Sequence, residues 1–143
     1  MDQPIVEKAV EIISAKGRDC VLALIDLDGY PTASAVTVLK NDGIEWFTFC
    51  TVLGNNKTKR IDKCNRASVC FMDSSLLDPV YNITLVGKIE VLTDPEIKKE
   101  MWTAGIGMED QWTGPEDKNY CVLKFTTERY RLFIDWKTTE GKI

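Results

Sequence analysis

The chain has 143 residues, 44% of them hydrophobic, a formal net charge of −4 and no histidine. This length suits one domain, 1–143, with a real apolar core, and the negative charge argues against a general nucleic-acid binder, which needs clustered Lys and Arg. The absence of histidine excludes Ser-His-Asp and Cys-His catalysis and histidine-ligated metal sites, so we expect no metal.

Residues 1–17 predict an N-terminal cap helix. The apolar side chains recur at helical spacing and would share one face, and a glycine follows as a typical stop: Ile5, Ala9, Ile12, Ile13 and Gly17. This pattern is typical of an amphipathic helix that covers a core with one side.

Three extended segments follow the helix. Residues 20–27 are short and apolar, and the Asp28-Gly29 turn separates them from a second extended run over residues 31–40, which indicates a hairpin. A further turn signal at residues 41–43 precedes an apolar strand over residues 44–51. We therefore expect a meander of three strands.

The next helix is expected over residues 55–63 and begins with Asn55, Asn56 and Lys57. Unpaired backbone N–H groups at a helix start point outward, and the helix macrodipole places partial positive charge there. A phosphate would be stabilised at such a site. The alternative interpretation is that Asn55 or Asn56 only caps the helix and that Lys57 is solvated.

A second pair of strands follows. Residues 67–73 read as a strand, residues 74–79 as a loop, and residues 80–92 as a long strand with an alternating apolar face. Gly87 lies in the middle of that strand and predicts a β-bulge or a close backbone approach.

The last third of the chain predicts a short helix capped by Asp94, with Pro95 at its first position. A turn-rich loop then leads to residues 121–135, which read as a final strand pair or as one long bent strand, and residues 136–143 are expected to be a polar tail. Together the elements predict a mainly β fold, a six-stranded antiparallel barrel with short capping helices.

Five cysteines, at positions 20, 50, 64, 70 and 121, form no CxxC pair. An odd number without such spacing is a poor disulfide framework and a poor zinc pattern, so reduced thiols are expected. The N-terminus has no apolar signal-peptide core, and the longest purely apolar run, residues 21–25, is far shorter than the roughly 20 residues that a membrane span needs. We therefore expect a cytoplasmic protein without membrane contact.

Several motifs occur in a characteristic order: Gly29-x-Pro31, Trp46-Phe47 to Thr51, Lys57 with Ile61, Asn65 before Ser68 to Phe71, Val86 to Val91, Asp94 with Trp102, and Gly114-Pro115 before Val122 to Phe125. In this order the chain resembles the pyridoxamine 5′-phosphate oxidase-like family of FMN-binding split barrels, and within it the general-stress-protein branch. The resemblance implies a Greek-key split barrel that forms a homodimer, with FMN at the subunit interface.

The resemblance also implies a set of cofactor-binding residues. Asn55 and Lys57 would hold the FMN phosphate, and Trp112 would reach the partner subunit's flavin, with ordinary interface packing as the alternative for the tryptophan. Two backbone segments would flank the isoalloxazine ring: Ser34, Ala35, Val36 and Thr37 in one, and Phe49, Cys50 and Thr51 in the other, with Thr51 also near the phosphate.

The chain departs from its relatives in two places. Ser34 stands where many relatives have an arginine for the phosphate, which would weaken binding by roughly 1.5 to 3 kcal/mol, the range for a charged hydrogen bond. Pyridoxamine phosphate oxidases proper also carry C-terminal arginine and histidine residues for their substrate, whereas this chain ends in WKTTEGKI. Pyridoxamine phosphate oxidation is therefore not expected.

The expected function is that of an FMN-binding oxidoreductase which passes electrons or hydride between flavin and a small molecule, with a role in stress response implied by the branch. No side chain stands out as a catalytic acid or base, and the sequence does not name the substrate. The alternatives are a non-catalytic flavin carrier or sensor, and the same barrel with a deazaflavin or haem.

Overall fold

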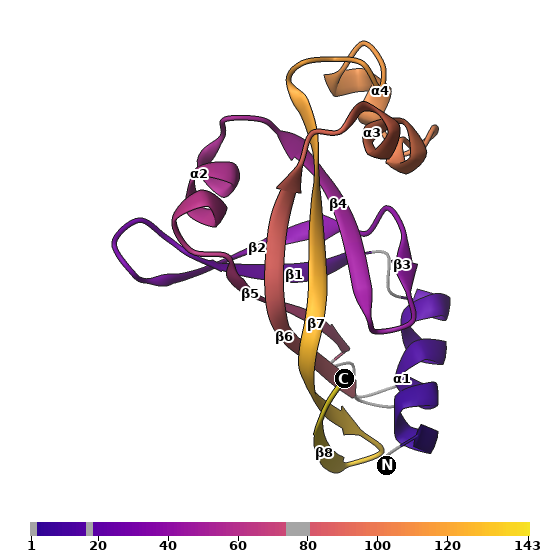
Figure 1. Ribbon diagram of the computed structural model, residues 1–143. Helices are drawn as coiled ribbons and strands as arrows, with labels where there is room; N and C mark the ends of the chain where they lie inside the picture. The colour runs from indigo at the N-terminus through magenta and orange to yellow at the C-terminus, as the bar shows by residue number, and fades with distance from the viewer. Residues whose placement is uncertain (1–2, 17–18, 74–80) are drawn as a thin grey trace.

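The computed structural model describes residues 3–16, 19–73 and 81–143 (Figure 1). The helices in these ranges are α1 Gln3–Lys16, α2 Asn56–Lys63, α3 Pro95–Met101 and α4 Met108–Gln111. The strands are β1 Asp19–Ile25, β2 Pro31–Thr37, β3 Asn41–Asp42, β4 Trp46–Val52, β5 Arg66–Asp73, β6 Tyr81–Leu92, β7 Tyr120–Ile134 and β8 Lys137–Lys142. The protein is mainly β, as predicted, with eight described strands rather than six. The loop expected over residues 74–79 lies outside the described residues.

The sheet closes on itself because a short connection joins its two edges. The strand order is β2-β1-β5-β6-β7-β4-β3, and β8 pairs with β7. Only residues 38–40 separate β2 from β3, and the four Cα steps between them span at most about 14 Å. The N–H of Leu39 also donates to the carbonyl of Thr48 at 2.8 Å. The sheet must therefore curl until its edges meet, which gives the antiparallel split barrel that the sequence predicts.

The predicted meander of the first three strands is wrong. β1 and β2 form the expected hairpin, but β4 pairs with β7 and β3 and not with β2. Val38 and Leu39 are buried in succession, each 3% exposed, which strict alternation along one strand does not allow. The extended run over residues 31–40 therefore breaks after Thr37, where the chain crosses from one edge of the sheet to the other.

β6 and β7 form the longest ladder of the barrel, and its register shifts between Val86 and Gly87. The alternation predicted for β6 is confirmed, since Ile83, Leu85 and Ile89 are almost completely buried. A Cβ atom on Gly87 would lie 2.0 Å from the carbonyl oxygen of Thr126. The glycine therefore marks both a bulge and a close backbone approach.

Residues 136–143, expected to be a polar tail, contain strand β8, which pairs with β7 from Arg129 to Ile134. The turn between the two strands is formed by Asp135 and Trp136, whose φ angles are 54° and 65°. Positive φ at both central positions is typical of a two-residue hairpin, where Asn-Gly is the usual sequence signal. Because the pair here is Asp-Trp, the sequence carries no such signal. Two contacts support this turn: an ion pair between Asp135 and Lys8, and an edge contact between the rings of Trp136 and Phe133.

The helices cover the ends of the barrel. α1 buries Ala9 and Ile13 against the main core, as its predicted apolar face requires, and α3 begins with the predicted Asp94 cap, whose Oδ1 accepts from the N–H groups of Glu96 and Ile97. α3 and α4 lie together beyond the upper ends of β4 and β7 (Figure 1). In the described part of the chain, no helix combines the length and the apolar character needed to cross a membrane.

Candidate functional site

A pocket of about 420 Å³ opens where the end of β4 meets the start of α2. Its volume falls within the range of small-molecule sites, roughly 300 to 1,000 Å³. We call it the β4–α2 pocket. Its walls come from the end of β2, the end of β4, the first turn of α2 and the α4 segment: Ala35, Val36, Thr37, Leu39, Cys50, Thr51, Val52, Asn55, Lys57, Ile106, Gly107, Met108, Gln111 and Trp112.

Asn55 fixes the polar end of the pocket. Its side-chain oxygen accepts from the N–H of Thr58 at 3.1 Å, which makes it the N-cap of α2, and its Nδ2 donates to the hydroxyl of Thr51 at 2.7 Å. Gly54, with φ of 84°, turns the chain between β4 and the helix, and its N–H donates to the Thr58 hydroxyl. Of the two asparagines considered as the cap, the structure shows Asn55 in that role. The asparagine also ties the helix start to the end of β4.

The first turn of α2 directs positive charge at this end of the pocket. The N–H groups of Asn56 and Lys57 have no intrahelical acceptor, because they belong to the first residues of the helix. Lys57 is half-buried and lines the pocket, and no other lysine or arginine is among the lining residues. A helix N-terminus combined with one ammonium group suits a small anionic group such as a phosphate.

The opposite part of the pocket is apolar. Val52 and Ile106 lie at its rim and expose 40% and 45% of their surface. Met108, the first residue of α4, and Trp112, which follows its last residue, are buried in a small cluster with Tyr120. An amphipathic ligand with an anionic end and a flat apolar part would match both ends of the pocket.

Trp112 is held in place by its neighbours. Its ring lies 5.1 Å from that of Tyr120, centroid to centroid. The Tyr120 hydroxyl donates to the carbonyl of Lys98 at 2.8 Å, and the buried Lys98 ammonium donates to the carbonyl of Asp117 at 2.8 Å. The tryptophan is only 5% exposed within this chain, so one face of the pocket has a firm aromatic wall. Its contact with a partner's flavin stays a prediction.

Cys50 is the only thiol in the pocket wall. Burial raises the pKa of this thiol above its usual value, and a backbone hydrogen bond opposes that effect only in part. The side chain is therefore neutral near pH 7 and contributes a small apolar surface rather than a thiolate nucleophile.

The structure brings most of the predicted cofactor-binding residues together. Eight of the ten line the β4–α2 pocket: Ala35, Val36, Thr37, Cys50, Thr51, Asn55, Lys57 and Trp112. Ser34 and Phe49 are not among the lining residues. β2 places Ser34 opposite Leu22 of β1, and the Phe49 side chain is 1% exposed in the main core. The roles expected for their backbones stay predictions.

Six lining residues were missed by the sequence analysis: Leu39, Val52, Ile106, Gly107, Met108 and Gln111. Four of them belong to the segment around α4, which was expected to be a loop. The sequence signal for a helix in this segment was the four-residue spacing between Met108 and Trp112, which places both side chains on one helical face. Among the described residues, no cluster of three or more His, Cys, Asp or Glu side chains could hold a metal ion.

Both the sequence and the fold of this chain are similar to those of known proteins. The sequence profile of a family described as pyridoxamine 5′-phosphate oxidase matches residues 5–133. A search of curated proteins found no match.

Three solved structures are examples of proteins whose fold is similar to that of this chain. A Clostridium acetobutylicum protein related to general stress protein 26 of B. subtilis is 26% identical, with a TM-score of 0.86 over 100% of this chain and 97% of that one. A heme binding protein from Mycobacterium smegmatis is 19% identical, with a TM-score of 0.76 over 96% of this chain and 57% of that one. A pyridoxamine 5′-phosphate oxidase-related, FMN binding protein from Nostoc punctiforme is 11% identical, with a TM-score of 0.68 over 99% and 95%.

Proposed function

Because this chain belongs to the pyridoxamine 5′-phosphate oxidase family, we propose that it binds FMN in the β4–α2 pocket and acts as a flavin-dependent oxidoreductase. The observation that carries the proposal is the convergence of eight predicted cofactor-binding residues on one pocket with a helix N-terminus at its polar end. The likeness to a protein related to general stress protein 26 supports a role in stress response. Five free cysteines support a reducing, cytoplasmic setting.

The residues of the pocket suit the two parts of FMN. The phosphate would lie at the start of α2, where the backbone N–H groups and Lys57 donate hydrogen bonds. The apolar ring would lie against the wall formed by Met108 and Trp112, away from water. Thr51 and Asn55 bond to each other and so hold the strand end and the helix start at a fixed spacing.

The chain's own chemical contribution would be binding and orientation. The titratable side chains that line the pocket are Cys50 and Lys57, and burial keeps the cysteine neutral. When bound, FMN supplies the hydride or electron transfer itself. Protons would then be exchanged with solvent or with the substrate rather than with a buried acid or base of this chain.

Flavin binding is tested by the visible spectrum of the purified protein and by titration with FMN, followed through flavin fluorescence. We expect either a yellow preparation or saturable binding of added FMN at one site per chain. A colourless protein that leaves excess FMN unbound would refute the proposal. Competition against a deazaflavin and haem separates the alternative cofactors, and the raised pKa of Cys50 disfavours thiolate ligation of haem in this pocket.

Turnover separates an enzyme from a carrier. Steady NAD(P)H-dependent reduction of the bound flavin, with continued reduction of an acceptor, is expected of an oxidoreductase. Tight FMN binding without such turnover would identify a carrier or sensor, the second function that the lack of a catalytic acid or base favours.

We further propose that the protein is a homodimer whose partner covers the β4–α2 pocket. Val52 and Ile106 expose large apolar surfaces at the rim of the pocket, and a second subunit would remove these surfaces from water. Sedimentation velocity at micromolar concentration is expected to give the mass of a dimer. A monomer that still binds FMN tightly would show that the pocket is complete within one chain.

A further inference from the structure

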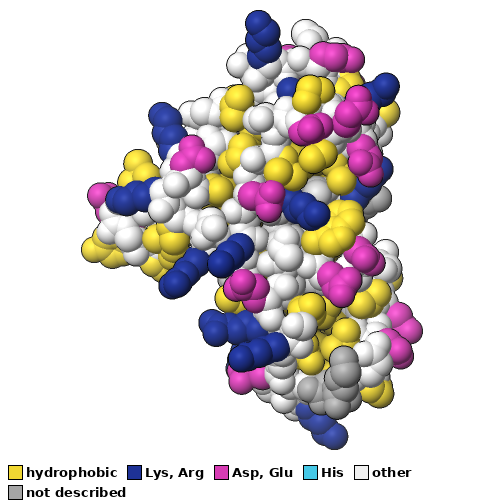
Figure 2. Space-filling view, viewed as in Figure 1, with side chains coloured by type: hydrophobic (Ala, Val, Ile, Leu, Met, Phe, Trp, Pro, Cys, Tyr) yellow, Lys and Arg dark blue, Asp and Glu magenta, His cyan; other side chains and the backbone are white. Residues whose placement is uncertain are grey.

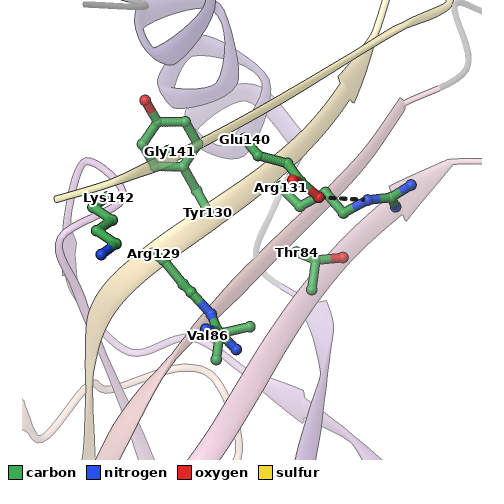
Figure 3. A pocket seen from close by; sticks show the side chains of 8 residues that line it. All are labelled: Thr84, Val86, Arg129, Tyr130, Arg131, Glu140, Gly141 and Lys142. Atoms are coloured by element: carbon green, nitrogen blue, oxygen red, sulfur yellow. Dashed lines mark ion pairs between the residues drawn. The ribbon is translucent and has the colours of Figure 1, made fainter.

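A second groove, of about 490 Å³, lies on the outer face of the barrel over β6, β7 and β8 (Figure 3). We call it the basic groove. It is lined by three cationic side chains, one carboxylate and four other residues: Arg129, Arg131, Lys142, Glu140, Thr84, Val86, Tyr130 and Gly141. It shares no lining residue with the β4–α2 pocket.

The bulge in β7 brings the two arginines to this face. Before the bulge, Phe125 points to the core and Thr126 is exposed. After the register shift at Val86 and Gly87, Arg129 lies opposite Val86, and the exposed positions of the strand become odd-numbered. An unbulged strand would turn Arg129 and Arg131 toward the core, because successive side chains alternate between the two faces.

Strand β8 brings the third cation. Arg129 lies directly opposite Lys142, two residues along from the pair Arg131 and Glu140. A Cβ atom at Gly141 would lie 2.3 Å from the Tyr130 hydroxyl oxygen, so the glycine leaves room for the Tyr130 ring against β8. The pairing of β7 with β8 holds Lys142 beside Arg129.

Opposed like charges are unfavourable across two antiparallel strands, and this face has two such pairs. Arg129 faces Lys142, and on the neighbouring strands Arg66 faces Lys88. Lys and Arg side chains gather in the lower left of the face shown in Figure 2, where Figure 1 draws β5 and the lower part of β6. The whole chain carries a net charge of −4, so this local excess of positive charge runs against the composition.

Little within the chain compensates these cations. Arg131 pairs with Glu140 at 3.3 Å, but both side chains are more than half exposed, and such pairs contribute about 0 to 1 kcal/mol. Within residues 3–16, 19–73 and 81–143, neither Arg129 nor Lys142 forms a salt bridge. The groove is therefore a set of positioned cations whose mutual repulsion an anion would relieve.

We propose that the basic groove binds a small anion with two or more negative charges, of the phosphate or polycarboxylate class. The Arg129 guanidinium would bind the anion through paired N–H donors, with Lys142 as a second cation on the adjacent strand. Val86 forms an apolar floor, and Thr84 lies at the other side of the groove, where its hydroxyl donates to the Oδ1 of Asn82 at 3.1 Å. Glu140 repels such a ligand and limits its affinity.

The proposal is tested by calorimetric titration with two probes, inorganic pyrophosphate and citrate, at low ionic strength. The probe that binds more tightly identifies the phosphate or the carboxylate class. Arg129→Gln and Lys142→Gln are each expected to weaken binding about fivefold to tenfold, and Glu140→Gln to strengthen it. Titrations in a Lys57→Ala background exclude the β4–α2 pocket as the site and should give the same affinity.

Lys137→Gln is the matched control, because it removes the same charge from the same strand at a position outside the groove. It should change the affinity less than twofold. Equal losses in Lys137→Gln and Lys142→Gln would mean general attraction by surface charge and would overturn the proposal. Failure of both probes to bind at millimolar concentration would overturn it as well. Neither result would bear on FMN binding in the other pocket.

Discussion

Replacing Gly87 by alanine is expected to destabilise the barrel by about 3 kcal/mol, at the upper end of the range for overpacked positions. The new Cβ atom would lie 2.0 Å from the carbonyl oxygen of Thr126 and 3.1 Å from the nitrogen of Glu128. Both neighbours are backbone atoms of the bulge, so no side-chain rotation relieves the contact. Urea unfolding followed by circular dichroism measures the change in the free energy of unfolding.

Gly105→Ala is the matched control for this substitution. Gly105 has φ of 86° with nothing within 4 Å of a new Cβ atom, so the cost there is only that of a left-handed backbone, about 1 to 2 kcal/mol. Gly87→Ala should cost clearly more than Gly105→Ala. If the two variants lost equal stability, the bulge would be soft enough to absorb a methyl group and would not hold Arg129 in a fixed position.

The local features of this fold could be predicted from the sequence because each depends on neighbouring residues. Apolar residues at every second position predicted β6, and the Asp94-Pro95 pair predicted the start of α3. The pairing of β4 with β7 could not be predicted, since the paired residues lie 68 to 80 positions apart, from Val52 with Tyr120 to Trp46 with Thr126, and no local pattern selects one apolar strand over another. β8 was missed for a different reason: Asp135 and Trp136 adopt positive φ without the usual glycine or asparagine pair.

The polar half of the site was predictable and the apolar half was not. Asn55 and Lys57 stand at a recognisable strand-to-helix junction, where capping chemistry restricts the residue types. Ile106 and Met108 reach the pocket only because α4 is short and folds back over the barrel end, in a segment rich in turn signals. The basic groove was not anticipated either, because the bulge that turns Arg129 outward is a property of two paired strands.

Lys57→Ala is expected to weaken FMN binding by about tenfold or more, which corresponds to the 1.5 to 3 kcal/mol of a charged hydrogen bond. Two features of the structure make this lysine important. The Asn55 side chain already caps α2 and bonds to Thr51, and Ser34, the position at which the resemblance implies an arginine in many relatives, is not among the lining residues. Lys57 is therefore the cationic donor for a phosphate at the start of α2, beside the helix N–H groups. Fluorescence titration with FMN measures the change.

Lys59→Ala provides the control on the same helix. Lys59 is exposed and lies outside the β4–α2 pocket, so its loss removes an equal charge at a similar distance from the helix start. Its effect on FMN affinity should be less than twofold and should vanish in salt, since exposed charges are screened within about 10 Å at 0.1 M. Lys57→Arg should restore much of the affinity, because it returns a cation to the same helical turn. Unchanged affinity in Lys57→Ala would show that the phosphate lies elsewhere.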